Sequence, residues 1–133
     1  NAAHRGVKVR VMTNSRESND IGIVSDAARY FYDDLVDAGV EIYEKHGGTL
    51  HSKTMTVDGT YSIVGSVNLN GRSQWRDSES MAAISGESTA RKLEHRFQSG
   101  LSECKRITSH ELDEESFMTN LQQWAISFLA PTF

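Results

Sequence analysis

A tight-turn signal at residues 58–60 is the feature that most constrains the fold of this chain. Asp58-Gly59-Thr60 separates two segments with the composition of strands, residues 50–57 and 61–66. An Asp-Gly pair between such segments favours an antiparallel hairpin, because the turn needs residues that tolerate positive φ. The free ends of the two strands lie side by side at the open end of such a hairpin, so polar residues there are expected to meet in one patch.

The rest of the chain alternates between strand and helix patterns. Alternating or short apolar runs predict strands at residues 7–12, 40–43 and 79–84. Apolar residues at helical spacing predict helices over residues 25–38, about 90–104 and about 114–129. The first strand, helix and second strand should form a right-handed crossover between parallel strands. The expected fold class is α/β, a mixed β-sheet flanked by helices in a single domain over residues 1–133.

Composition narrows the classes of function. The net charge of −4 argues against non-specific nucleic-acid binding, which needs a basic surface. Because Cys104 is the only cysteine, a disulfide framework and a zinc site built on paired cysteines are both excluded. Residues 1–6 read like the last turn of a helix that ends at Gly6, so we expect the chain to be cut from a longer protein.

The chemistry-bearing residues flank the predicted hairpin. His51 and Lys53 are two residues apart, so on a strand they point to the same side. An ammonium group can neutralise phosphate oxygens while a neutral imidazole attacks phosphorus or moves a proton. Ser66 and Asn68 can bring a hydroxyl and an amide to the same patch, as donors to phosphate oxygens that add no charge.

Residues 51–68 fill every position of the pattern H-x-K-x4-D-x6-G-S-x-N, here His51, Lys53, Asp58, Gly65, Ser66 and Asn68. This resembles the signature of the phospholipase D superfamily. The run from Asn68 to Ser73 and the C-terminal residues 124–131 are similar to the second catalytic half of bacterial cardiolipin synthases. Asn70 and Asp77 depart from the pattern of that family, whereas Glu79 keeps it.

The resemblance implies a two-step phosphodiester exchange without a metal or a cofactor. One histidine attacks phosphorus to form a phosphohistidine, and a second histidine protonates the leaving alcohol. His51 is either of these, and Lys53, Ser66 and Asn68 are expected to hold the phosphoryl oxygens. Glu79 is the candidate carboxylate that orients His51, and Asp58 competes for that role or serves the turn.

The implied function is that of a cardiolipin synthase-like phosphatidyltransferase acting on a phosphatidylglycerol-like phospholipid. The implied partners are a second histidine motif, in a missing N-terminal half or a homodimer partner, and a membrane surface reached through the parent protein. The expected location is the cytoplasmic side of a bacterial cell membrane, and no nucleic acid is expected. Two alternatives stay open: a single-motif endonuclease of the same superfamily, active as a homodimer, and a half whose motif only binds phosphate.

Overall fold

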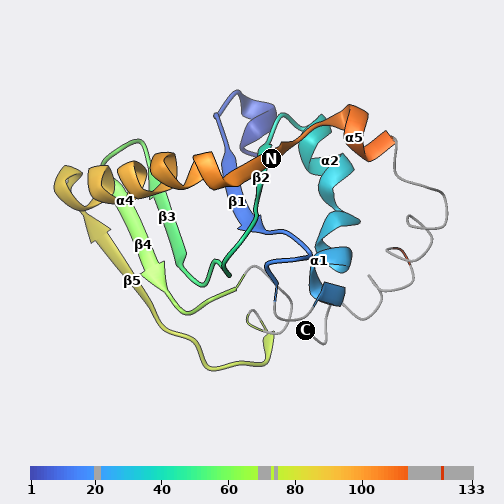
Figure 1. Cartoon of the computed structure of the whole chain (residues 1–133). Coiled ribbons are helices and arrows are strands. Elements are labelled where there is room, and N and C mark those ends of the chain that lie inside the picture. The colour runs from blue at the N-terminus through green and yellow to red at the C-terminus, as the bar shows by residue number, and fades with distance from the viewer. Residues whose placement is uncertain (20–21, 69–72, 74, 114–123, 125–133) are drawn as a thin grey trace. The chain divides into compact units, whose positions relative to one another are not determined.

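The computed structural model describes residues 1–19, 22–68, 73, 75–113 and 124 (Figure 1). The chain divides into two compact units, residues 1–50 with 103–130 and residues 51–102 with 131–133. Each unit contains a three-stranded sheet with helices, and the α/β class predicted from the sequence is confirmed. The strands therefore form two separate sheets, one in each unit.

The sheet of the first unit is mixed. Strand β1 (Arg10–Asn14) runs parallel to β2 (Glu41–Lys45), which pairs antiparallel with β6 (Cys104–Ile107). Helices α1 (Gly22–Arg29) and α2 (Tyr32–Asp37) make the connection from β1 to β2 (Figure 1). The predicted crossover between parallel strands is therefore confirmed.

The core of the first unit lies between α2, β2, β6 and α5 (Ser109–Asp113). Its buried apolar residues are Tyr32, Ile42, Ile107 and Leu112. Residues of β2 alternate between half-buried and buried, and this alternation turns Glu44 inward together with Ile42. A buried carboxylate needs a partner, and Arg29 supplies it.

The single helix predicted over residues 25–38 is wrong, because α1 ends at Arg29 and α2 begins at Tyr32. The interruption changes the helical phase. As a result, Phe31 and Leu35, predicted on the apolar stripe, are exposed, whereas Tyr32 is buried and Val36 packs on the core. Apolar spacing alone did not reveal which face the second helical segment buries.

The second unit contains the predicted hairpin. Strand β3 (Lys53–Val57) pairs antiparallel with β4 (Tyr61–Gly65), which pairs with β5 (Met81–Ser85). The turn between β3 and β4 has φ of 50° at Asp58 and 64° at Gly59, the left-handed conformations that Asp and Gly tolerate. The hairpin prediction is confirmed.

Helix α4 (Glu87–Gly100) packs against β3 and β4 on one face of this sheet (Figure 1). Ser62 of β4 and Ala90 of α4 are fully buried. Strand alternation places other apolar side chains on the opposite face, where they are exposed, with Val57 opposite Tyr61 and Met81 opposite Gly65 at the other end of β4. They are Met55, Val57, Tyr61 and Met81.

Two further helices were predicted from the sequence. The helix predicted to reach residue 104 ends at Gly100, and Cys104 instead begins β6, where it is half-buried. The helix predicted over residues 114–129 lies outside the described residues, apart from Trp124. In the part of the chain that the structure describes, no helix is long and apolar enough to cross a membrane.

Candidate phosphoryl-transfer site

The site begins at the open end of the β3–β4 hairpin. Lys53 is the first residue of β3, and His51 lies two residues before it. The ammonium Nζ of Lys53 donates a hydrogen bond to the backbone carbonyl of His51 over 2.8 Å. His51 is exposed and Lys53 is half-buried. The lysine charge is thus held beside the histidine backbone, next to an imidazole that solvent and a substrate can reach.

Ser66 lies at the same end, because Gly65 pairs with Lys53 in the hairpin. The backbone N–H of Ser66 donates to the carbonyl of Ser80 over 3.0 Å. The backbone N–H of Ser80 donates to the Ser66 Oγ over 3.1 Å. The Ser66 hydroxyl in turn donates to the carboxylate of Glu79. These three bonds fix the hydroxyl between β4 and the segment that leads into β5.

Glu79 is held in its ionised form by its neighbours. The hydrogen bond from Ser66 lowers its pKa the most, followed by a hydrogen bond from Ser73. The charge of Lys53 lowers this pKa further, whereas Asp77 and desolvation oppose the shift. A serine hydroxyl can donate one hydrogen bond, and Ser66 donates it to Glu79. Lys53 is then left as the donor to an incoming phosphate.

Asn68 and Ser73 extend the same cluster. The Asn68 amide Nδ2 donates toward the Ser73 hydroxyl over 3.5 Å, and Ser73 is buried, with 6% of its surface exposed. Ser73 therefore links Asn68 to Glu79. Ser73 was not predicted as a site residue, although its place at the end of the run from Asn68 was the available signal.

Asp58 lies away from this cluster. It stands in the turn that joins the far ends of β3 and β4, while His51 precedes the first residue of β3. Its side chain is exposed. The structure thus gives Asp58 a place in the turn and does not bring it together with His51, and the partnership of Glu79 with His51 stays a prediction.

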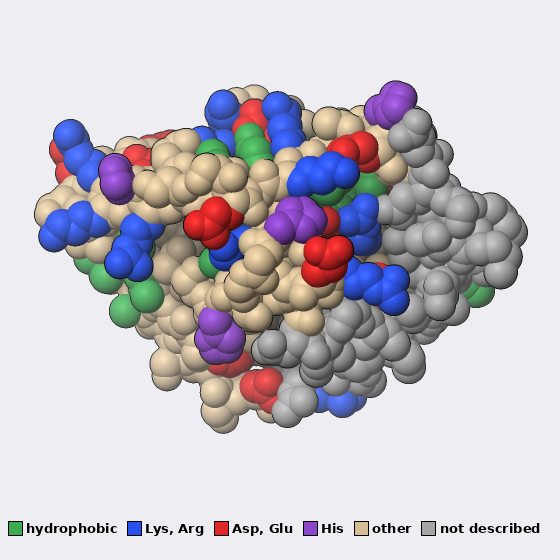
Figure 2. Space-filling model, viewed as in Figure 1, with side chains coloured by type: hydrophobic (Ala, Val, Ile, Leu, Met, Phe, Trp, Pro, Cys, Tyr) green, Lys and Arg blue, Asp and Glu red, His purple; other side chains and the backbone are tan. Residues whose placement is uncertain are grey.

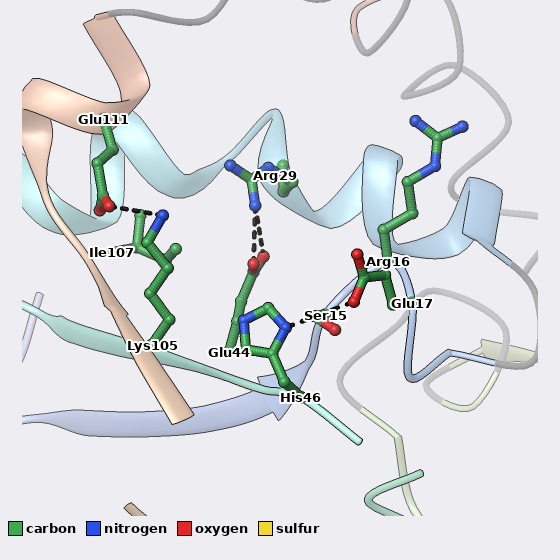
Figure 3. A pocket seen from close by; sticks show the side chains of 9 residues that line it. All are labelled: Ser15, Arg16, Glu17, Arg29, Glu44, His46, Lys105, Ile107 and Glu111. Atoms are coloured by element: carbon green, nitrogen blue, oxygen red, sulfur yellow. Dashed lines mark hydrogen bonds and ion pairs between the residues drawn. The ribbon is translucent and has the colours of Figure 1, made fainter. Parts of the chain in front are cut away.

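A separate hollow in the first unit has a volume of about 440 Å³ and is lined by charged side chains (Figure 3). Arg29 forms an ion pair with Glu44 there and Lys105 with Glu111, and the Nδ1 of His46 lies 3.8 Å from the Glu17 carboxylate, as Figure 3 shows. Arg16 also lies 3.4 Å from Asp26. Because each acidic side chain here has a basic partner within the fold, we interpret the side chains that line this hollow as structural partners of one another in the first unit.

Among the described residues, no group of three or more His, Cys, Asp or Glu side chains is arranged to hold a metal ion. Arg72, part of the run that follows Asn68, lies outside the described residues.

The sequence matches a known family. The family described as "Cardiolipin synthase, PLD-like domain" matches residues 1–101. Cardiolipin synthase A of Proteus mirabilis is 34% identical over 130 residues, which cover 98% of this chain and 26% of the relative. Cardiolipin synthase A of Yersinia pseudotuberculosis is 50% identical over 78 residues, which cover 59% of this chain and 16% of the relative. The chain spans about a quarter or less of the length of these curated relatives.

Solved structures share the fold. Phosphatidylserine synthase of Haemophilus influenzae superposes with a TM-score of 0.67 at 14% identity, over 99% of this chain and 37% of that one. The phospholipase D family member Nuc of Salmonella typhimurium superposes with a TM-score of 0.63 at 18% identity, over 81% of this chain and 69% of that one. At these identities the likeness shows the fold alone, and it confirms the predicted phospholipase D-like fold.

Proposed function

This chain belongs to the cardiolipin synthase family of phospholipase D-like domains, and on that premise we propose that it supplies one histidine half of a phosphatidyltransferase active site. The observation that carries the proposal is the cluster at the open end of the hairpin. Lys53, Ser66 and Glu79 interact there, beside the exposed His51. A cation, hydrogen-bond donors and an accessible imidazole are the groups that a phosphodiester exchange requires.

In the proposed reaction, the imidazole of one histidine attacks phosphorus, and the bond from phosphorus to the leaving alcohol breaks. A second histidine gives its proton to that alcohol. An acceptor alcohol then attacks the phosphohistidine, loses its proton to the second histidine and releases the first. His51 takes one of these two roles. Lys53 neutralises the anionic oxygens, Asn68 donates to them, and Ser66 joins when its proton turns away from Glu79.

The second histidine has to come from another motif, in an N-terminal half of the parent protein or in a homodimer partner. The exposed apolar face of the β3–β4–β5 sheet supports such a partner. Met55 and Met81 are 51% and 58% exposed on the face that also carries Lys53. Several exposed apolar side chains on one face of a sheet are typical of a surface that another domain covers.

The proposed substrate is a phosphatidylglycerol-like phospholipid, with a second lipid alcohol as acceptor. The match to the cardiolipin synthase family supports this choice. The reaction would take place at the cytoplasmic face of a bacterial cell membrane, reached through the parent protein. The net charge of −4 is consistent with a substrate other than nucleic acid.

The test uses the full-length protein that carries this chain, with phosphatidylglycerol vesicles labelled in the phosphate. We expect formation of a lipid with two phosphatidyl groups and an acid-labile phosphate on a histidine. The variant His51→Ala should lower turnover by at least about 10³-fold, within the range that positioned acid–base or nucleophilic groups supply. His4→Ala, which changes a histidine of the first unit, is the matched control. Undiminished turnover in His51→Ala, or metal-free cleavage of a plasmid in place of lipid transfer, would contradict the proposal.

A further inference from the structure

We propose that the outer face of α4 docks on a membrane surface that contains anionic phospholipids. We call this surface the α4 basic face, and it consists of Arg91, Lys92, His95 and Arg96. The proposal rests on the proposed lipid-directed function and adds to it a surface outside the reacting site. Figure 2 shows lysine, arginine and histidine side chains gathered over α4.

The α4 basic face points away from the sheet of its unit. Ala90 is fully buried, and Leu93 and Phe97 are half-buried, at the helical spacing of an inward stripe. The four basic residues lie between these positions, are all exposed and line an open hollow of about 410 Å³. Their apolar stems and charged ends are therefore available to a partner outside the unit.

The charges on this face repel one another. Lys92 and Arg96 are four residues apart, so they lie on adjacent turns of the helix. Like charges at this spacing destabilise a helix. Within the described residues, Glu87 forms an ion pair with Arg91 over 2.7 Å, and no ion pair is formed by Lys92 or Arg96. An anionic partner would relieve this repulsion.

Helix α4 carries a net charge of +1, from three Lys or Arg and two Glu side chains, whereas the chain as a whole carries −4. This overall charge repels a nucleic acid and an anionic membrane alike, so local features decide between them. Helix α4 has no fully exposed aromatic side chain on which bases could stack. A membrane surface needs only a local cluster of cations, each of which contributes about 1 kcal/mol near anionic lipid. The α4 basic face therefore fits a lipid surface better.

This surface is distinct from the reacting site. Helix α4 packs on the sheet face that contains Ser62, whereas register and alternation place Lys53 on the opposite face. Lys92 and Arg96 therefore contact head groups other than that of the reacting lipid, on the side of the second unit opposite to Lys53. Phosphatidylglycerol, the lipid class of the proposed substrate, provides such head groups.

The test measures flotation of the whole 133-residue chain with vesicles of phosphatidylcholine, with or without one quarter phosphatidylglycerol. We expect binding only to the vesicles with phosphatidylglycerol, and weaker binding as salt rises. The double variant Lys92→Gln, Arg96→Gln should lower the partition coefficient roughly 10- to 30-fold, because it removes two cations. The control Arg5→Gln, Lys8→Gln makes the same change of charge in the first unit and should bind like the unchanged chain.

Equal binding to both kinds of vesicle, or an equal loss in the control, would overturn the proposal. So would a DNA duplex that binds the chain and displaces it from the vesicles. Circular dichroism of both double variants establishes that the helix content is retained. Because flotation needs no turnover, its failure with transfer activity intact in the full-length protein refutes the docking surface alone. Retained flotation without transfer activity refutes the proposed function alone.

Discussion

The hydroxyl of Ser66 donates a hydrogen bond to the carboxylate of Glu79, thirteen residues further along the chain. This bond joins the end of β4 to the segment before β5, beside Lys53. Two residues of the candidate site are therefore hydrogen-bonded to each other, and this bond competes with a hydrogen bond from Ser66 to a phosphate. The state of this bond decides whether Ser66 can serve as a donor to phosphate.

The variant Ser66→Ala should raise the pKa of Glu79 toward its ordinary value of 4.5, since the Ser66 hydrogen bond is the main cause that lowers it. A depressed carboxylate pKa contributes stability above pH 4.5, and this contribution is lost as the pH falls through the folded pKa. The variant should therefore lose less stability on acidification. Carboxyl-resolved NMR titration measures the shift. Ser80→Ala, which keeps the backbone bonds to Ser66, is the control, and an unchanged pKa in Ser66→Ala would contradict the assignment.

The glycine of the signature has a steric reason in this structure. A Cβ added to Gly65 would lie 2.3 Å from the Ser80 carbonyl oxygen and 2.9 Å from the Met81 Cγ. We expect Gly65→Ala to push β5 away from β4 and to lower the free energy of unfolding by about 1–3 kcal/mol, as overpacking does. Urea denaturation measures the change. At Gly48 an added Cβ meets no described atom within 4 Å, so Gly48→Ala is the control, and equal stability of the two variants would refute the steric explanation.

The sequence predicted the hairpin and the cluster at its open end because both depend on local rules. Turn chemistry at Asp58 and Gly59 sets the register, and the register brings Lys53 beside Gly65. The link from Ser66 to Glu79 was not predictable in this way. It depends on how the segment between β4 and β5 returns to the sheet, which is a matter of tertiary packing.

Helix boundaries and the buried faces of helices were the weakest predictions, because they too depend on tertiary packing. The apolar spacing of residues 28–38 fits a continuous helix, but the chain breaks between α1 and α2 so that Tyr32 can enter the core. Cys104 continues the apolar spacing of α4, yet it pairs with Lys45 as the first residue of β6. Core packing overrides local periodicity in the first place, and strand pairing between residues far apart in sequence overrides it in the second.

The variant Met55→Glu tests the apolar face of the second sheet as the site of a partner half. Because Met55 is 51% exposed, the substitution should change the stability of the chain by no more than about 0.5 kcal/mol. In the full-length protein it should lower transferase activity at least tenfold, since a charge would be buried in the interface. Thr54→Glu, at an exposed position on the other face of β3, is the control. Full activity of Met55→Glu would show that this face is not covered.

The variant Glu44→Gln tests the ion pair that closes the core of the first unit. Glu44 is 4% exposed and accepts two hydrogen bonds of 2.8 Å from Arg29, as Figure 3 shows. Removal of its charge leaves the half-buried guanidinium of Arg29 without this carboxylate, which should lower the free energy of unfolding by about 3 kcal/mol in urea titrations. Glu87→Gln, which breaks the exposed pair with Arg91, is the control and should have little effect.

The same variant should move the titration of Tyr32. Burial raises the pKa of Tyr32 well above its usual value of 10.0, and Glu44 raises it further through its charge and a hydrogen bond. A raised pKa means that this contribution to stability is complete below pH 10 and is lost as the pH rises toward the folded pKa. In Glu44→Gln the ultraviolet titration of Tyr32 should begin at lower pH but stay above the usual value, because burial remains. An unchanged pKa of Tyr32 in this variant would contradict the effect of Glu44 on Tyr32.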